Sequence, residues 1–297
     1  MTRRRFALLV VVAVLAVWRV VFSAQSRPAG APAQAPQRIV SLVPATTEML
    51  YAMGAGAKVI GVGTYDHYPP AVEKLPRLGG LLDPNIEQLI ALRPDLVIVY
   101  DTQTDLRRRL ERAGIPMWSY SIKALADVTS TMRELGQRIG MAADAGKAAD
   151  SVDAQLRAVQ SRVAHLQRPR ALLVFGREPG SLRGINASGG YGFLHDLLLL
   201  AGGTDVLDDV KQPAVSMSSE MVLARAPEVI IELHYGETLA PARVEAERRV
   251  WQSLPSVPAV KTGRIVLLMG NEFVVPGPRV VQAAEQLARA LHPEAGR

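Results

Sequence analysis

The sequence contains no cysteine, and this absence removes several functional classes at once. Without thiols the chain cannot have a disulfide framework, a thiolate metal site, a cysteine nucleophile or a lipid-modified N-terminal cysteine. A chain without thiols suits an exported protein as well as a cytosolic one. The 297 residues also hold no excess of glycine (24) or proline (20), which excludes collagen-like and low-complexity chains.

The sequence also lacks the motifs of common enzymes. The first predicted strand runs into Ser41–Thr46, which is not the G-x-G-x-x-G of a dinucleotide site, and neither a P-loop nor a G-x-S-x-G elbow occurs. The five histidines are scattered, so at most two of them reach one cleft, which is few for a dedicated zinc or manganese site. We therefore expect no catalysis, no resident cofactor and no metal bound by the protein alone.

Little charge remains once the N-terminus is set aside. The formal net charge is +6, but Arg3, Arg4, Arg5 and Arg19 lie in the first 24 residues. The rest of the chain is only weakly basic, whereas a nucleic-acid surface needs clustered positive charge. We expect no nucleic-acid partner.

The N-terminus has the pattern of an export signal. The basic residues Arg3–Arg5 precede the unbroken apolar run Phe6–Trp18, an arrangement that keeps the charge cytoplasmic while the apolar segment enters the membrane. We predict that residues 1–24 form a signal peptide or an N-terminal membrane anchor, and both stay open because Phe22 is bulky for a cleavage site after Ala24. The Ala-, Pro- and Gln-rich residues 25–37 read as a flexible tether. The expected location is the periplasm, with membrane contact only through this segment.

The body of the chain alternates short β-branched runs with helical segments through tight turns, which is typical of parallel sheets covered on both faces. We predict an α/β fold with two Rossmann-like lobes, residues 38–141 and 169–297, each built on a parallel sheet. Residues 142–168 are the predicted bridge, one long α-helix with an apolar stripe through Val152, Leu156 and Val159. A surface helix within one large domain is the alternative.

The two predicted lobes contain an internal repeat. Residues Glu87–Ile98 align without gaps on Glu220–Ile231: a glutamate begins a short helix, and alanine, proline, an acid and a buried strand follow at equal spacing. Proline turns end helices in many αβ units, but that does not explain the matched glutamates. One explanation of the matched glutamates is helix stabilisation, because a carboxylate at the start of a helix is stabilised by about 0.3–1 kcal/mol through the helix dipole. The other explanation is docking to a partner at two points, with the acid of each lobe pairing with a guanidinium group.

These segments carry a family resemblance. Together with Ile39–Glu48 and Tyr68–Pro70, the repeat resembles the periplasmic substrate-binding proteins of ABC importers for cobalamin and iron–siderophore complexes, over about residues 38–292. The resemblance implies two lobes bridged by one helix, a metal chelate held between them and delivery to transmembrane permease subunits. It also implies that Glu87 and Glu220 dock into permease arginines. We expect a monomer with small lobe movements and a largely preformed cleft, because a helix bends less than a loop hinge.

Candidate ligand contacts lie where predicted strands end, since the carboxyl ends of parallel strands converge at binding sites. Aromatic faces suit a macrocycle, and the polar groups suit its rim. The candidates are Tyr65, His67, Tyr68, Arg177, Tyr191, His234, Tyr235, Glu272 and Phe273. Near positions 80 and 214, cobalamin-binding members of the family have tryptophans, whereas this chain has Gly80 and Ala214. A corrinoid and a ferric siderophore both stay open as ligands. A binder of haem or of a free metal ion such as zinc or manganese, and a sensor on the same fold, are the alternatives.

Overall fold

The computed structural model describes residues 35–236 and 238–294. The predicted signal or anchor, residues 1–24, and most of the predicted tether lie outside the described residues. Among the residues that it does describe, no helix is both long and apolar enough to cross a bilayer.

The first sheet is fully parallel, as predicted, and has the strand order β2-β1-β3-β4. Its strands are β1 (Ile39–Ser41), β2 (Val59–Val62), β3 (Leu96–Tyr100) and β4 (Met117–Tyr120). Helices α2 (Pro44–Ala52), α3 (Ile86–Ala91), α4 (Thr104–Arg112) and α5 (Asp127–Arg138) and the short 3₁₀ turns η1 (Gly56–Lys58) and η2 (Pro70–Lys74) accompany them. Neighbouring β3 residues enter different cores, Ile98 on one face and Val97 and Val99 on the other, so both faces are covered. We call this part the N-lobe.

The second sheet is mixed, which corrects the prediction of a parallel one. Its order is β10-β9-β5-β6-β8, with β7 beside β5, and β6 runs antiparallel to β5 and β8. A hairpin closed by the Glu178 N–H on the Arg183 carbonyl joins β5 to β6, and a connection that short produces only antiparallel neighbours. The strands are β5 (Arg170–Gly176), β6 (Ile185–Ala187), β7 (Thr204–Asp205), β8 (Val215–Met217), β9 (Val229–His234) and β10 (Ile265–Met269). We call this part the C-lobe.

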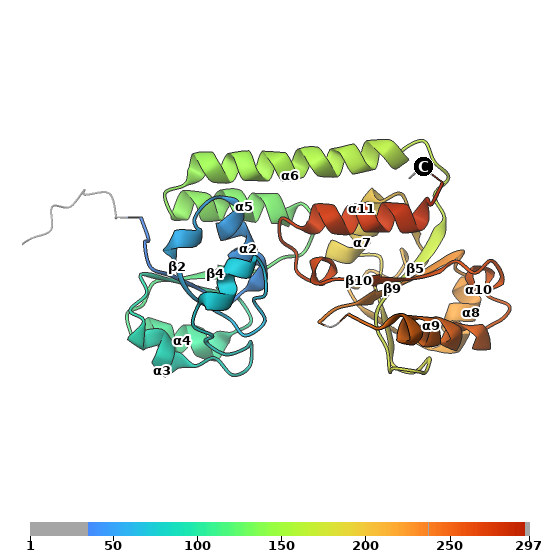
Figure 1. Ribbon diagram of the computed structural model, residues 1–297, viewed down its shortest axis with the longest axis horizontal. Coiled ribbons are helices and arrows are strands. Elements are labelled where there is room, and N and C mark those ends of the chain that lie inside the picture. Colours follow the sequence, from blue (N-terminus) through green and yellow to red (C-terminus); the bar gives the residue numbers. More distant parts are fainter. Residues whose placement is uncertain (1–34, 237, 295–297) are drawn as a thin grey trace, which may run out of the picture. The chain divides into compact units, whose positions relative to one another are not determined.

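The C-lobe helices lie on both faces of its sheet (Figure 1). They are α7 (Phe193–Leu200), α8 (Ser219–Arg225), α9 (Pro241–Val250), α10 (Pro258–Lys261) and α11 (Val280–Leu291), with 3₁₀ turns η3 (Trp251–Ser253) and η4 (Asn271–Phe273). The predicted helix over residues 193–200 and its stop at Gly202 are confirmed. Gly202 has a positive φ of 88°, which ends the helix at low cost.

One long helix, α6 (Ala142–Val163), connects the lobes. It ends five residues before the predicted boundary at residue 168 and is about 33 Å long at 1.5 Å per residue. The predicted stripe is confirmed, because Val152, Leu156 and Val159 are all buried. Helix α6 packs on α5 of the N-lobe and on α11 of the C-lobe (Figure 1), and its stripe belongs to an apolar cluster that includes strands of both sheets. This continuous core couples both lobes to the same rigid element.

Candidate functional site

Glu87 and Glu220 occupy the first turns of helices α3 and α8. The N-cap of α3 is Asn85, whose side-chain oxygen accepts the Gln88 N–H at 3.0 Å, and the N-cap of α8 is Ser218, whose hydroxyl accepts the Met221 N–H at 3.3 Å. Both glutamates are exposed, and neither forms an ion pair with any described residue. Hydrogen bonds from Ser218 and from the backbone lower the pKa of Glu220, so its carboxylate is charged at neutral pH.

The internal repeat extends to the contacts that hold these two helices in place. In the N-lobe, the Asp95 carboxylate accepts the Arg38 N–H at 2.8 Å, and the Arg38 guanidinium donates to the carbonyl groups at the end of α3. In the C-lobe, Glu228 accepts the Arg170 N–H at 2.8 Å, and the Arg170 guanidinium donates to the Arg225 carbonyl at the end of α8.

The backbone follows the same repeat. Each helix is followed by a residue of positive φ at the matched position, Arg93 at 48° and Ala226 at 46°. Neither is a glycine, and such a conformation is uncommon for other residues. The two acid-bearing helices are therefore held to their sheets by equivalent contacts, beyond the similarity of any two αβ units.

A buried ionic cluster joins the lobes and includes two of the predicted ligand contacts. Arg279, which precedes α11, forms a two-pronged pair with Glu48 of α2, with Nε–Oε2 at 3.0 Å and Nη2–Oε1 at 2.5 Å. Its Nη1 lies 3.3 Å from Glu272, and its guanidinium stacks over the ring of Tyr68 at 4.4 Å. Burial raises the pKa of Glu48, and the neighbouring Arg279 offsets part of that rise.

Sequence reasoning missed Arg279 and Glu48. A signal was present, because Glu48 is a charged residue within a helix whose other residues from Ala45 to Leu50 are also buried, and a buried charge requires a partner. The partner lies 231 positions away and no local pattern identifies it.

A second buried cluster lies at the carboxyl ends of β5 and β9. Arg177 contacts Glu232 at 3.0 Å and Glu247 at 2.9 Å, and the Trp251 Nε1–H donates to Glu232 at 3.0 Å. The Arg177 side chain is only 2% exposed. Its charge is therefore already paired inside the C-lobe, although Arg177 also lines the hollow that His234 and Tyr235 border.

His234 and Tyr235 border a hollow of about 170 Å³ beside this cluster. His234 Nε2 lies 2.9 Å from the Glu232 carboxylate, which holds its ring in place, and Tyr235 is exposed. Both candidates lie at the carboxyl end of the single strand β9, where His234 is the last strand residue and Tyr235 follows it.

Four of the seven tyrosines are exposed, and all four are predicted candidates: Tyr65, Tyr68, Tyr191 and Tyr235. The Tyr65 ring lies beside Gly80, where an added Cβ would meet it at 3.3 Å. Tyr191 lies in a loop fixed by the Gly190 N–H on the Val210 carbonyl, against the segment that leads to Ala214. An exposed tyrosine thus lies against Gly80, and a second one, Tyr191, lies in the loop that is hydrogen-bonded to Val210, four residues before Ala214.

The remaining candidates differ in accessibility. His67 is exposed and its Nδ1 lies 3.4 Å from Glu73. Phe273 has no exposed surface, because turn η4 directs its ring into the core, and Glu272 is largely buried against Arg279. The prediction that Phe273 covers a ligand is therefore in conflict with its burial: following a strand does not determine which way a side chain points.

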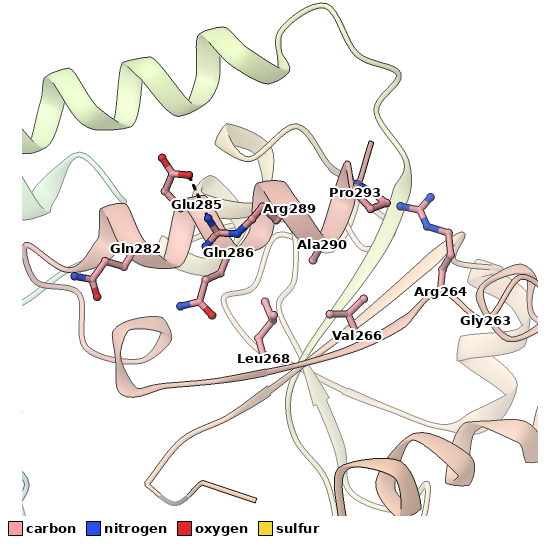
Figure 2. A pocket seen from close by; sticks show the side chains of 10 residues that line it. All are labelled: Gly263, Arg264, Val266, Leu268, Gln282, Glu285, Gln286, Arg289, Ala290 and Pro293. Carbon is pink, nitrogen blue, oxygen red and sulfur yellow. Dashed lines mark ion pairs between the residues drawn. The ribbon is translucent and has the colours of Figure 1, made fainter. Parts of the chain in front are cut away.

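A hollow of about 820 Å³ lies elsewhere, between strand β10 and helix α11 (Figure 2). Val266, Leu268 and Ala290 form its apolar wall, and an ion pair between Glu285 and Arg289 at 3.8 Å lies along it. None of the predicted site residues lines this hollow.

Comparison with known proteins agrees with the two-lobe architecture. The family model described as periplasmic binding protein matches residues 39–271. This chain belongs to the periplasmic binding protein family.

Three relatives are similar over most of their length. A vitamin B12-binding protein of Yersinia pestis (strain Pestoides F) is 28% identical over 262 residues, 88% of each chain. The crystal structure of the periplasmic vitamin B12 binding protein BtuF of Vibrio cholerae has a TM-score of 0.72 at 25% identity, covering 89% of this chain and 100% of that one. An ABC-type Fe3+-hydroxamate transport system structure from Saccharomonospora viridis has a TM-score of 0.66 at 25% identity, covering 86% and 93%.

Proposed function

We propose that this chain is the non-enzymatic substrate-binding component of an ABC importer. It captures a cobalamin-like corrinoid or a ferric-siderophore chelate between its lobes and delivers the chelate to the transmembrane permease. The observation that carries this proposal is the pair of exposed glutamates, Glu87 and Glu220, which have no ion-pair partner among the described residues and are held on equivalent helices of the two lobes. An acid that only stabilised its own helix would not need the same position and the same supporting contacts in both lobes.

We propose that the ligand contacts the accessible candidates of both lobes. Tyr65, His67 and Tyr68 come from the N-lobe, and Tyr191, His234 and Tyr235 come from the C-lobe. Tyrosine rings offer large flat surfaces with a polar end, which suits a planar or multiring chelate. The buried candidates are placed differently: Arg177 lines the hollow beside His234 and Tyr235, Glu272 lies against Arg279, and Phe273 belongs to the core. The relatives named for vitamin B12 and for Fe3+-hydroxamate support a metal-centred organic ligand. No cofactor of the protein's own is proposed.

We further propose that the chain acts in the periplasm as a monomer, with residues 1–24 as a signal peptide or membrane anchor and residues 25–37 as a tether. Residues 38–141 and 169–297 are the lobes, and residues 142–168 are the bridge. Family membership supports export.

Ligand identity is tested by titrating the purified protein with cyanocobalamin, haem, ferric hydroxamate and ferric catecholate, followed by tryptophan quenching and visible absorbance. We expect saturable binding of one of the corrinoid or siderophore probes. Tight binding of free Zn(II) with none of these chelates would contradict the proposal and favour a metal-ion binder.

Docking is tested separately with the double variant Glu87→Arg, Glu220→Arg. We expect loss of ligand uptake with unchanged ligand affinity, because charge reversal repels the permease arginines without touching the ligand contacts. The matched control is Glu111→Arg with Asp144→Arg, which reverses two exposed acids on α4 and α6 and should leave uptake intact. Loss of ligand binding in the Glu87, Glu220 variant would place both residues in the ligand site instead.

A further inference from the structure

Matched residues of helices α3 and α8 are buried or exposed to a similar extent. Leu89 and the matched Val222 are completely buried and fix each helix to its lobe. One residue later, Ile90 and Leu223 are 44% and 40% exposed. The repeat therefore places a branched aliphatic side chain on the outer surface of both lobes, at the same position of the same helix.

Each exposed aliphatic residue lies three positions after the glutamate of its helix. Residues three apart in an α-helix are neighbours on one face, with Cβ atoms about 5–6 Å apart. Ile90 therefore adjoins Glu87, and Leu223 adjoins Glu220. In the C-lobe, the next residue after Glu220, Met221, is also exposed, but it points to a different side of the helix.

A single exposed aliphatic residue is ordinary on a protein surface. Here two occupy equivalent places, and each lies beside an acid that has no ion-pair partner among the described residues. An acid next to an apolar side chain is complementary to a surface with a cation beside an apolar recess. Contact there would also exclude water from the ion pair and strengthen it, because the attraction between charges rises as the effective dielectric falls.

We propose that Ile90 and Leu223 are the apolar half of the docking surface, and that each inserts beside the basic residue of an importer transmembrane subunit that receives the neighbouring glutamate. This inference rests on the proposed function and names the residues through which the chain recognises its partner. The occupant is the periplasmic surface of the transmembrane subunits.

The test is photo-crosslinking in intact cells of the native host. The photoreactive amino acid p-benzoylphenylalanine is placed at position 90, 223, 87 or 220 in turn, and at positions 111 and 144 as controls. Adducts are identified by mass spectrometry. We expect positions 90 and 223 to crosslink to a transmembrane subunit of an ABC importer and the controls not to do so.

The other outcomes separate the two proposals. Adducts from positions 87 and 220 without adducts from 90 and 223 would overturn this inference and leave the proposed function standing. An absence of permease adducts at all four positions would overturn both. Equal adducts from the control positions would show nonspecific proximity and overturn this inference.

A second measurement uses the importer identified in this way, purified in nanodiscs. Ile90→Ser and Leu223→Ser should each weaken binding to it by about tenfold, an estimate from the apolar area removed from the contact. The conservative exchanges Ile90→Leu and Leu223→Ile should retain wild-type affinity. Both residues are exposed, so the variants should keep the wild-type unfolding midpoint. Wild-type affinity in the two serine variants would overturn the inference.

Discussion

The pair between Arg279 and Glu48 provides the sharpest test of how the lobes are joined. The perturbation is Arg279→Met, which keeps much of the side-chain volume and removes the charge. Glu48 then keeps a buried carboxylate without its two-pronged partner. Removal of one partner from a buried ion pair costs roughly 3–5 kcal/mol, and because Arg279 is 15% exposed we expect a loss near the lower end, about 3 kcal/mol.

The loss should depend on pH with a defined sign. Burial raises the pKa of Glu48 above its unfolded value of 4.5, and removal of Arg279 takes away the interactions that lower it. A carboxyl with a raised folded-state pKa binds more protons in the folded state, so its unfavourable effect grows as pH rises above the unfolded pKa. The deficit of the variant should therefore be largest at pH 8 and smaller at pH 5, where protonation of Glu48 relieves the buried charge.

The assay is urea denaturation of wild type and variant at pH 5 and pH 8, read by circular dichroism. The control is Glu48→Gln combined with Arg279→Met, in which both charges are absent, and it should lose less stability at pH 8 than Arg279→Met alone. Equal losses for Arg279→Met at the two pH values, or a double variant that is no more stable, would refute the reasoning.

Two further predictions concern a buried carboxyl and the ligand contacts. Burial raises the pKa of Asp66 to about 7, and although Thr47 and Gly63 lie near enough to lower it in part, neither carboxyl oxygen has a hydrogen bond of good geometry. Because this folded-state pKa lies above the unfolded one, the Asp66 carboxyl should by itself lower stability by about 4 kcal/mol between pH 4 and pH 8. In urea denaturation, Asp66→Asn should therefore be less destabilised by that rise in pH than wild type, and an identical pH dependence of the two proteins would contradict this. Tyr65→Ala and Tyr191→Ala should each weaken chelate binding about tenfold, measured by titration. Tyr65→Phe should bind the chelate nearly as tightly as wild type, because the ring face makes the contact. Wild-type affinity in both alanine variants would exclude these contacts.

Local patterns predicted the features that local forces determine. The α6 stripe, the helix over residues 193–200 and the parallel N-lobe sheet follow from side-chain periodicity and from glycine and proline positions. The antiparallel β6 was missed because its signal is a hairpin of a few residues inside a run of parallel units.

Site residues were harder to predict, because sequence order indicates only that a residue follows a strand. Tyr235 and Phe273 both follow strand ends, yet one is exposed and the other has no exposed surface. The ion pairs of Arg177 and Arg279 were beyond local reasoning for another reason: Glu247 and Glu48, with which they pair, lie on elements far away in the chain. The paired glutamates could be found from the sequence because they occupy the same position in two copies of an internal repeat. Recognising a repeat requires no knowledge of which residues are in contact in the fold.

The same connections constrain how the molecule works. Bending α6 would disrupt the packing of its apolar stripe, because this helix packs on both α5 and α11. Separating the lobes would break the buried contact between Arg279 and Glu48. Both changes are costly, so we expect the lobes to shift only slightly when a ligand binds. Affinity then depends on side chains already in place, and helices α3 and α8, the proposed docking helices, keep nearly the same relation with and without ligand. In the docking that we propose, an importer that distinguishes the loaded state would therefore have to sense small displacements at Glu87 and Glu220, and a rigid two-point contact detects these better than a single flexible one.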